Sequence, residues 1–218
     1  MECRYCQGQC SKFGKQANGA QRYRCKLCNK TQQKNYRYRA CGLKTSDLFL
    51  KCLKIGSSLR GIQYITGIAV STQLRWIRAI SKSIQSPTKI RLYDEYELDE
   101  LCTYVGNKGR RRWVISAISK TTGKVVDIKV GTRTLSNVKV VVDKVLSLSP
   151  KAVFTDKLNI YASLIPKSVH KIRRRGINRI ERYHLNLRTH IKRLNRRTIC
   201  YTKNEQVLNH LVRIYNWA

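Results

Sequence analysis

The chain has 218 residues and a hydrophobic content of 42%, which is too high for a disordered basic tail. No apolar run approaches the roughly 18 residues of a membrane-spanning helix, and the residues after Met1 lack the apolar core of a signal peptide. The 45 Lys and Arg outnumber the 12 Asp and Glu, and this net charge of +33 predicts a polyanionic partner, with nucleic acid first and an anionic membrane surface a distant second.

The nine cysteines predict a reducing compartment. Their number is odd, and more than half of them crowd into the segment from Cys3 to Cys28. Without an export signal, this pattern argues against the disulfide framework of a secreted protein.

The first zone, residues 1–40, predicts a zinc ribbon. It contains two C-x2-C pairs, Cys3 with Cys6 and Cys25 with Cys28, on either side of the segment 7–24. Two tight turns that each donate two sulfurs supply the tetrahedral set that structural zinc requires. The zone is poor in aliphatic residues, so we expect metal binding to provide its folding free energy. The alternatives are buried free cysteines or a redox pair, and Cys10 is a possible substitute ligand.

The second zone, residues 43–84, predicts a helix-turn-helix domain. We expect a first helix that ends at Gly56, a capped second helix over 57–67 that a glycine ends, and a third helix over 72–84 with Ser71 as its N-cap. A polar, basic last helix after a glycine turn is typical of a recognition helix in a DNA major groove. The alternative is a generic helical bundle or a linker.

The third zone, residues 88–218, predicts an α/β domain with a mixed sheet covered by helices. The expected strands cover 91–105, 113–119, 125–130, 152–155 and 168–172, and the expected helices cover 135–148, 159–165, 177–195 and 204–217. Three strands, a helix, a strand, a short helix, a strand and a helix, in this order, indicate a layered arrangement.

Acidic residues are scarce, so their positions carry information. Five of the 12 fall within residues 94–100. Phosphoryl transfer with two metal ions needs several carboxylates on adjacent elements, because Mg²⁺ prefers oxygen ligands. Asp99 in the first strand, Asp156 after a buried strand and Glu181 near the start of a long helix are positions from which three side chains can converge. The other acids of this zone are interpreted as solvated or helix-start residues: Asp127, Asp143 and Glu205.

Several segments together resemble one known family, the IS1-family transposases. The segments are 97–106 (ELDELCTYVG), 154–156 (FTD) with Tyr161, 179–188 (RIERYHLNLR), 194–198 (LNRRT) and 201–203 (YTK). The likeness extends to the zinc ribbon and the helix-turn-helix, and so spans essentially the whole chain. It implies a DDE transposase with an RNase-H-like catalytic domain.

The resemblance also implies the catalytic residues. Asp99, Asp156 and Glu181 would hold two Mg²⁺ or Mn²⁺ ions, with the segment 157–180 between the last two acids. Arg188 lies seven positions after Glu181, which is two helical turns, so both face the same side and Arg188 can hold a DNA phosphate.

The chain departs from the family pattern at two places. Family members often have Gly after the second Asp, where this chain has Lys157. The acidic helix often continues with His-Asn or Phe-Asn, where this chain has Tyr183 and His184. Neither departure removes a metal ligand. We expect the four histidines to be surface or DNA-facing residues without a catalytic role, and the three tryptophans to be core residues.

Basic residues in all three zones, together with one glutamine, are candidates for contact with DNA phosphates and bases. They are Arg22 and Arg24 beside the second cysteine pair; Gln73, Arg75 and Arg78 on the third helix; and Lys171, Arg173, Arg174, Arg175, Lys192, Arg193, Arg196 and Arg197 on either side of the helix that carries Glu181. The last group has an alternative reading as solvated faces.

The sequence therefore predicts a DNA transposase that binds the terminal inverted repeats of its element and cuts and joins DNA strands. We expect double-stranded DNA, both terminal repeats and target, as its partner. A homodimer or larger assembly on DNA, no membrane, and a cytoplasmic location at the bacterial nucleoid complete the expectation. The alternatives are a non-catalytic zinc and helix-turn-helix regulator, and an RNase-H-like nuclease without transposition.

Overall fold

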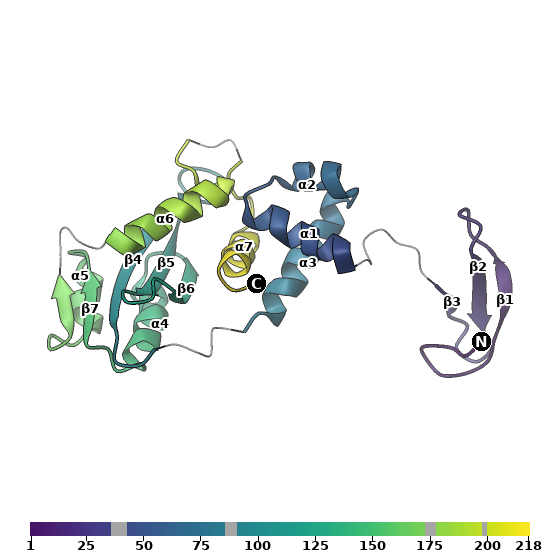
Figure 1. The fold of residues 1–218 in the computed structure, drawn as a ribbon, viewed down its shortest axis with the longest axis horizontal. Helices are drawn as coiled ribbons and strands as arrows, with labels where there is room; N and C mark the ends of the chain where they lie inside the picture. Colours follow the sequence, from purple (N-terminus) through teal and green to yellow (C-terminus); the bar gives the residue numbers. More distant parts are fainter. Residues whose placement is uncertain (36–42, 86–90, 173–177, 198–199) are drawn as a thin grey trace. The chain divides into compact units, whose positions relative to one another are not determined.

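The computed structural model describes residues 1–35, 43–85, 91–172, 178–197 and 200–218 (Figure 1). The chain forms two compact units, Met1–Thr45 and Ser46–Ala218. Among the helices that the structure describes, none has the length and apolar content needed to cross a bilayer.

The first unit is a three-stranded antiparallel sheet in the order β1-β2-β3. Its strands are β1 (Cys10–Lys15), β2 (Gln21–Cys25) and β3 (Thr31–Gln33). Within residues 1–35 the buried side chains are those of Cys3, Cys25, Gln32 and Gln33. Because this described part has no aliphatic core, hydrophobic burial contributes little to its stability.

The second unit begins within α1 (Leu43–Lys54), which is followed by α2 (Leu59–Thr66) and α3 (Val70–Ser83). The caps of α2 form as the sequence predicts: the Ser58 side chain accepts a hydrogen bond from the Gly61 N–H, and Gly67 ends the helix in the left-handed conformation. The third helix starts earlier than predicted. Ala69 is the last extended residue before it, so Ser71 lies inside the helix and is not its N-cap.

A five-stranded mixed sheet follows, in the order β6-β5-β4-β7-β8. Its strands are β4 (Glu95–Tyr104), β5 (Arg111–Ser119), β6 (Val125–Gly131), β7 (Ala152–Thr155) and β8 (His170–Ile172). β4, β5 and β6 pair antiparallel, whereas β7 pairs parallel with both β4 and β8. The predicted mixed sheet flanked by helices is confirmed.

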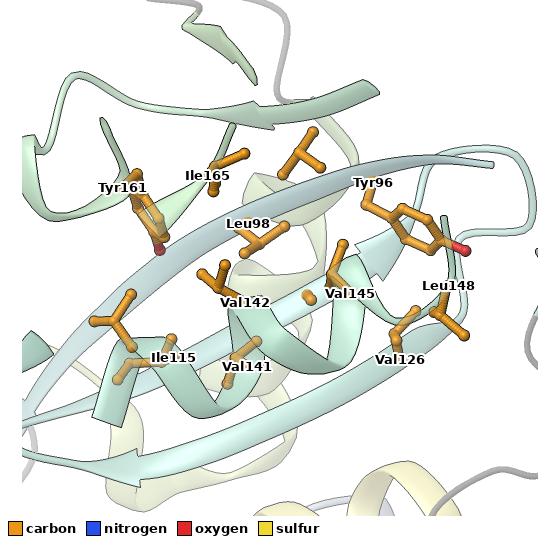
Figure 2. Packing of buried hydrophobic residues seen from close by; sticks show 13 residues of the cluster. Tyr96, Leu98, Ile115, Val126, Val141, Val142, Val145, Leu148, Tyr161 and Ile165 are labelled. Carbon is orange, nitrogen blue, oxygen red and sulfur yellow. The ribbon is translucent and has the colours of Figure 1, made fainter. Parts of the chain in front are cut away.

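Helices cover both faces of this sheet (Figure 1). They are α4 (Leu135–Leu146), α5 (Asn159–Leu164), α6 (Asn178–His190) and α7 (Glu205–Trp217), with a 3-10 turn over Lys192–Leu194. Tyr96 and Leu98 of β4 enter the core beneath α4 and α5, where Tyr161 also lies (Figure 2). Leu101 of β4 enters the opposite core, beneath α6 and α7. Odd and even residues of β4 therefore face different helices.

The last helix, α7, belongs to two cores at once. Its Leu208 and Val212 pack against the sheet, together with Leu187 of α6. Its Val207, Leu211 and Ile214 pack among the three N-terminal helices of this unit. The helices α1, α2 and α3 are thus joined to the sheet through α7. The three tryptophans are half-buried against these cores, in keeping with their expected role: Trp76, Trp113 and Trp217.

Two predicted elements differ from the observed ones by more than two residues at one end. The strand expected over 91–105 begins at Glu95, because Tyr93 has a φ of 53° and interrupts the extended chain. The helix expected over 177–195 ends at His190. Ile191 leaves the helical conformation, and this break lets both Ile191 and Leu194 enter the core beneath α6 and α7.

Gly56, after α1, lies close to the backbone of α6 at His190. It is buried with a φ of +87°, and a Cβ atom there would lie 2.5 Å from the backbone oxygen of His190. Gly106 has a similar φ of +81°, but a Cβ atom there would meet nothing within 4 Å. Alanine substitutions at the two positions therefore distinguish the cost of backbone strain from the cost of a steric clash.

We expect Gly106→Ala to cost about 1–2 kcal/mol, from backbone strain alone. Gly56→Ala should cost about 2 kcal/mol more, because α1 and α6 must also move apart. Urea unfolding of the full chain measures both losses of unfolding free energy. The slope of the unfolding free energy against urea concentration is compared between the variants. Equal losses in the two variants would contradict the close approach at Gly56.

Candidate functional site

The parallel pairing of β4 with β7 brings two of the predicted catalytic acids together. Glu97 and Phe154 are register partners in these strands. Asp99 and Asp156 each lie two positions further along the chain, so their side chains leave the sheet on the same face and at the same height. Carboxylate oxygens of Asp99, Asp156 and the neighbouring Glu100 all lie within 4.8 Å of one another.

Glu100 is the member of this cluster that the sequence interpretation missed. Burial raises its pKa to about 7; the nearby Tyr161 hydroxyl opposes this, and the carboxylates of Asp156 and Asp99 add to it. Within the described residues, its Oε1 is buried and accepts no hydrogen bond of ordinary geometry. Three converging carboxylates are the donor set that Mg²⁺ and Mn²⁺ prefer, so the residues present fit such an ion. The only sequence signal for Glu100 was the dense acidic run at 94–100.

Glu181, the third predicted acid, is exposed in the first turn of α6 and is not part of the cluster. The helix is held to β4 on either side of it. The Ile180 N–H donates to Oε2 of Glu97 at 3.0 Å, and Nδ1 of His184 lies 3.4 Å from Oδ2 of Asp99. The structure therefore gathers Asp99 and Asp156, and leaves Glu181 on the helix that packs beside them.

Arg188 lies two turns after Glu181 and is half-buried. Burial lowers its pKa, the Arg196 guanidinium lowers it further, and the charge of Asp99 opposes both. Its buried Nε has no hydrogen-bond partner among the described residues. A partly buried cation close to the acidic cluster, with an unused donor, is suited to hold an anionic group there.

A second cluster lies in the first unit. Its four sulfurs all lie within 4.8 Å of one another, and they belong to Cys3, Cys6, Cys25 and Cys28. The Sγ atoms of Cys3 and Cys28 are 3.6 Å apart, and those of Cys6 and Cys25 are 3.5 Å apart. A tetrahedron with metal–sulfur bonds of about 2.3 Å has edges of about 3.8 Å, so these four thiols fit one zinc ion.

Backbone donors surround this cluster. The Tyr5 N–H approaches Sγ of Cys3 at 3.4 Å, and the Leu27 N–H approaches Sγ of Cys25 at 3.3 Å. The backbone N–H of Cys28 is the main reason that the pKa of Cys25 falls to about 6. N–H groups directed at sulfur favour the thiolate, which is the form that binds metal.

Cys10 is not one of the four sulfurs. The buried Gln32 side chain donates to the Cys10 Sγ at 3.4 Å and to the Glu2 carbonyl at 2.8 Å. Burial raises the pKa of Cys10, and the adjacent Cys3 and Cys25 sulfurs add to this. Its surroundings therefore favour a neutral thiol beside the cluster.

Comparison with known proteins identifies the family. A family model described as IS1 transposase matches residues 95–216, which is more than half of the chain. The chain belongs to the IS1 transposase family. The acidic cluster and α6 lie inside the matched range, so the IS1 transposase family domain includes the sheet and the helices that cover it.

Curated relatives agree with this assignment. The insertion element IS1 protein InsB of Shigella flexneri is 32% identical over 125 residues, which cover 56% of this chain and 95% of the relative. The IS1 4 protein InsB of Escherichia coli K12 is also 32% identical over 125 residues, 56% of this chain and 75% of the relative. One matched solved structure is a simian T-cell lymphotropic virus intasome in complex with the PP2A regulatory subunit B56 gamma. The match covers 78% of this chain and 64% of the matched chain, with 12% identity and a TM-score of 0.35. A TM-score this low carries no structural inference.

In this IS1-family chain, Gln73 does not have the exposed position predicted for a DNA-contacting residue. It is fully buried, and its Nε2 donates to the carbonyl oxygens of Leu59 at 2.9 Å and Ile68 at 2.8 Å. Because both carbonyls belong to α2 and the turn that follows it, the amide joins the second helix to the third. The helical spacing places Gln73 on the inner face beside Ile77, whereas polarity alone suggested a surface residue.

Arg75 and Arg78 are exposed on α3, as a DNA-contacting role requires. Ser71 and Lys82 are exposed as well. Steps of three and four residues place these four side chains along one face of the helix. Lys82, which the sequence pattern also places away from the apolar face of this helix, completes the exposed face.

The other candidate DNA-binding residues differ in exposure. Arg22 and Arg24 of β2 both lie over the Phe13 ring, at 5.3 and 5.2 Å from its centroid. Arg193 is half-buried, and burial lowers its pKa. The exposed members are Arg24, Lys171, Lys192, Arg196 and Arg197. Arg173, Arg174 and Arg175 lie outside the described residues.

We expect Gln73→Ala to lower the free energy of unfolding by about 1–3 kcal/mol, because two buried carbonyls lose their donor. Arg75→Ala, on the exposed face of the same helix, should change it by no more than about 0.5 kcal/mol. Chemical denaturation of both variants measures the difference. A Gln73→Ala protein as stable as Arg75→Ala would show that the amide does not join the helices.

Proposed function

We propose that this chain is a DDE-type transposase that cuts DNA at the ends of its element and joins them to a target. The observation that carries the proposal is the meeting of Asp99 on β4 with Asp156 at the end of the parallel strand β7. Bound Mg²⁺ or Mn²⁺ would supply the Lewis acidity that activates water, and later a 3′-hydroxyl, for in-line attack on a phosphodiester. Asp99 and Asp156 would hold the ions, Glu181 would complete the site from α6, and Arg188 would hold a phosphate.

An RNase-H-like catalytic domain is part of this proposal. Three antiparallel strands followed by two parallel strands, with helices on both faces, support it. Glu100 is half-buried beside Tyr161 of α5, whereas Glu181 is exposed on α6. We therefore assign the main role to Glu181 and an auxiliary role to Glu100.

DNA recognition would be divided among the basic elements. We propose that α1, α2 and α3 act as a helix-turn-helix, with Arg75, Arg78 and Lys82 directed at the terminal inverted repeats. The exposed basic residues that follow α6 would contact DNA phosphates near the acidic cluster. They are Lys192, Arg196 and Arg197. Synapsis of two element ends would require at least a dimer on DNA.

The four-cysteine cluster would hold one structural zinc ion. The thiol spacing and the backbone donors support this assignment, and the absence of an aliphatic core in residues 1–35 gives the metal a folding role. The ribbon would then present Arg22 and Arg24 to DNA.

Acid-to-amide variants test the catalytic site. Asp156→Asn and Glu181→Gln should each reduce strand cleavage and end joining by more than about 100-fold, because each removes a metal ligand. Glu100→Gln should cause a smaller loss, and binding to the terminal repeats should persist in all three. Asp143→Asn, which changes an exposed acid paired with Lys139 on α4, is the matched control.

Nicking of supercoiled DNA and joining of pre-cut element ends provide the readouts. A Glu100→Gln loss larger than that of Glu181→Gln would make Glu100 the third ligand. Cleavage without end joining would identify a nuclease, and DNA binding without metal-dependent nicking would identify a regulator. Either of the last two results would overturn the transposase proposal.

Zinc removal tests the ribbon. The purified chain should contain about one zinc per chain, and Cys25→Ser should lose it and become protease-sensitive within residues 1–35. Cys10→Ser should keep the metal, because its sulfur lies outside the cluster. Metal analysis and limited proteolysis of the full chain give the answer. Equal zinc loss in both variants would reject the four-cysteine assignment.

A further inference from the structure

His184 lies on α6, faces the strands β4 and β5, and is only 7% exposed. Its Nε2 is 2.8 Å from Oγ of Ser116 on β5, and its Nδ1 is 3.4 Å from Oδ2 of Asp99 on β4. Asp99 and Ser116 are themselves direct register partners across the two strands. One imidazole therefore spans both residues of a cross-strand pair. This position differs from the surface location that the sequence suggested.

The hydrogen-bonding capacity of these groups determines where the protons lie. The Ser116 hydroxyl has one proton, which it can give to the imidazole at 2.8 Å or to the Asp99 backbone oxygen at 3.4 Å. The shorter contact favours Nε2 as the acceptor. A carboxylate only accepts, so the ring nitrogen that faces Asp99 must carry a proton. On this assignment the proton is on Nδ1, which lies 3.4 Å from Asp99 Oδ2, an ion-pair contact longer than an ordinary hydrogen bond.

The order serine, histidine, aspartate is also that of a hydrolase triad, but the geometry excludes a nucleophilic role here. The Ser116 side chain is completely buried and has no access to a substrate. The Asp99 side chain, by contrast, is 26% exposed. Of the three contacting residues, Ser116, His184 and Asp99, the one most accessible to solvent is thus Asp99, whose carboxylate belongs to the acidic cluster.

We propose that His184 is a positioning residue that fixes the Asp99 carboxylate for metal binding, with Ser116 orienting the imidazole. The proposal rests on the proposed metal-dependent function of Asp99. It also links two events, because α6 carries both His184 and Glu181: the contact that orients Asp99 is the contact that seats the helix on β4. A partner that donates to a ligating carboxylate typically changes metal affinity or activity by about 10–100-fold when it is lost.

Two substitutions separate donation from packing. His184→Leu keeps most of the volume and removes the donor, and it should raise the Mn²⁺ concentration for half-maximal nicking by about tenfold or more. His184→Gln keeps an N–H donor and should stay within about threefold of the unmodified chain. Mn²⁺ binding followed by electron paramagnetic resonance, without DNA, gives a readout independent of activity. Equal Mn²⁺ affinity in His184→Leu and the unmodified chain, or equal impairment in both variants, would overturn the proposal.

His210 offers a matched control. Its Nδ1 is 2.9 Å from Oγ of Ser81 on α3, so it makes the same kind of serine contact. Among the described residues, the charges that act on it are those of Arg78, Arg213 and Lys82, and none is a carboxylate. His210→Leu should leave the Mn²⁺ dependence unchanged, and a shift as large as that of His184→Leu would overturn the proposal. If His184→Leu does not fold, Ser116→Ala replaces it and should shift the Mn²⁺ dependence in the same direction by a smaller factor. An unshifted Ser116→Ala protein would then count against the proposal.

Failure of the inference and failure of the proposed function give different results. If the unmodified chain nicks DNA with Mn²⁺, Asp156→Asn does not, and His184→Leu behaves as the unmodified chain, only the positioning role is rejected. If the unmodified chain neither binds Mn²⁺ nor nicks DNA, the metal-dependent function itself is rejected, and the positioning role with it.

Discussion

The parallel pairing of β4 with β7 is the constraint on which the candidate site depends. Its register sets Asp99 beside Asp156, although β5, β6 and α4 lie between them in the chain. A register shift of one residue between β4 and β7 would turn one of these side chains to the other face of the sheet and would separate the carboxylates. The buried apolar residues of β4 and β7 oppose such a shift, because Leu98 and Val153 belong to the same core. Figure 2 shows Leu98 in that core.

The cluster concentrates negative charge in a chain with a net charge of +33. Repulsion among three carboxylates opposes their approach, and the raised pKa of Glu100 records that cost together with burial. The surrounding fold holds them in place: Glu97 accepts the backbone N–H of Ile180, and His184 contacts Asp99. A divalent cation would relieve the repulsion that remains, so the cluster is compatible with metal binding.

The shared use of α7 gives the second unit its continuity. Because this helix packs on both the sheet and the N-terminal helices, the exposed face of α3 and the acidic cluster are carried by one connected core. The close approach of Gly56 to His190 reinforces the connection at the end of α6. DNA held by α3 would therefore meet the acidic cluster through a packed framework, whereas a flexible linker would leave their separation variable.

The sequence by itself determined the local features: the cysteine pairs, the caps of α2, the order of strands and helices, and the places of Asp99 within a strand and Asp156 directly after one. These depend on spacing and on near neighbours. Only the tertiary structure decided that Gln73 is buried, that Glu100 joins the cluster, that Glu181 stays outside it and that His184 reaches Asp99. Each of these depends on which face of an element meets which neighbour, and that is set by strand register and helix packing between residues far apart in the chain.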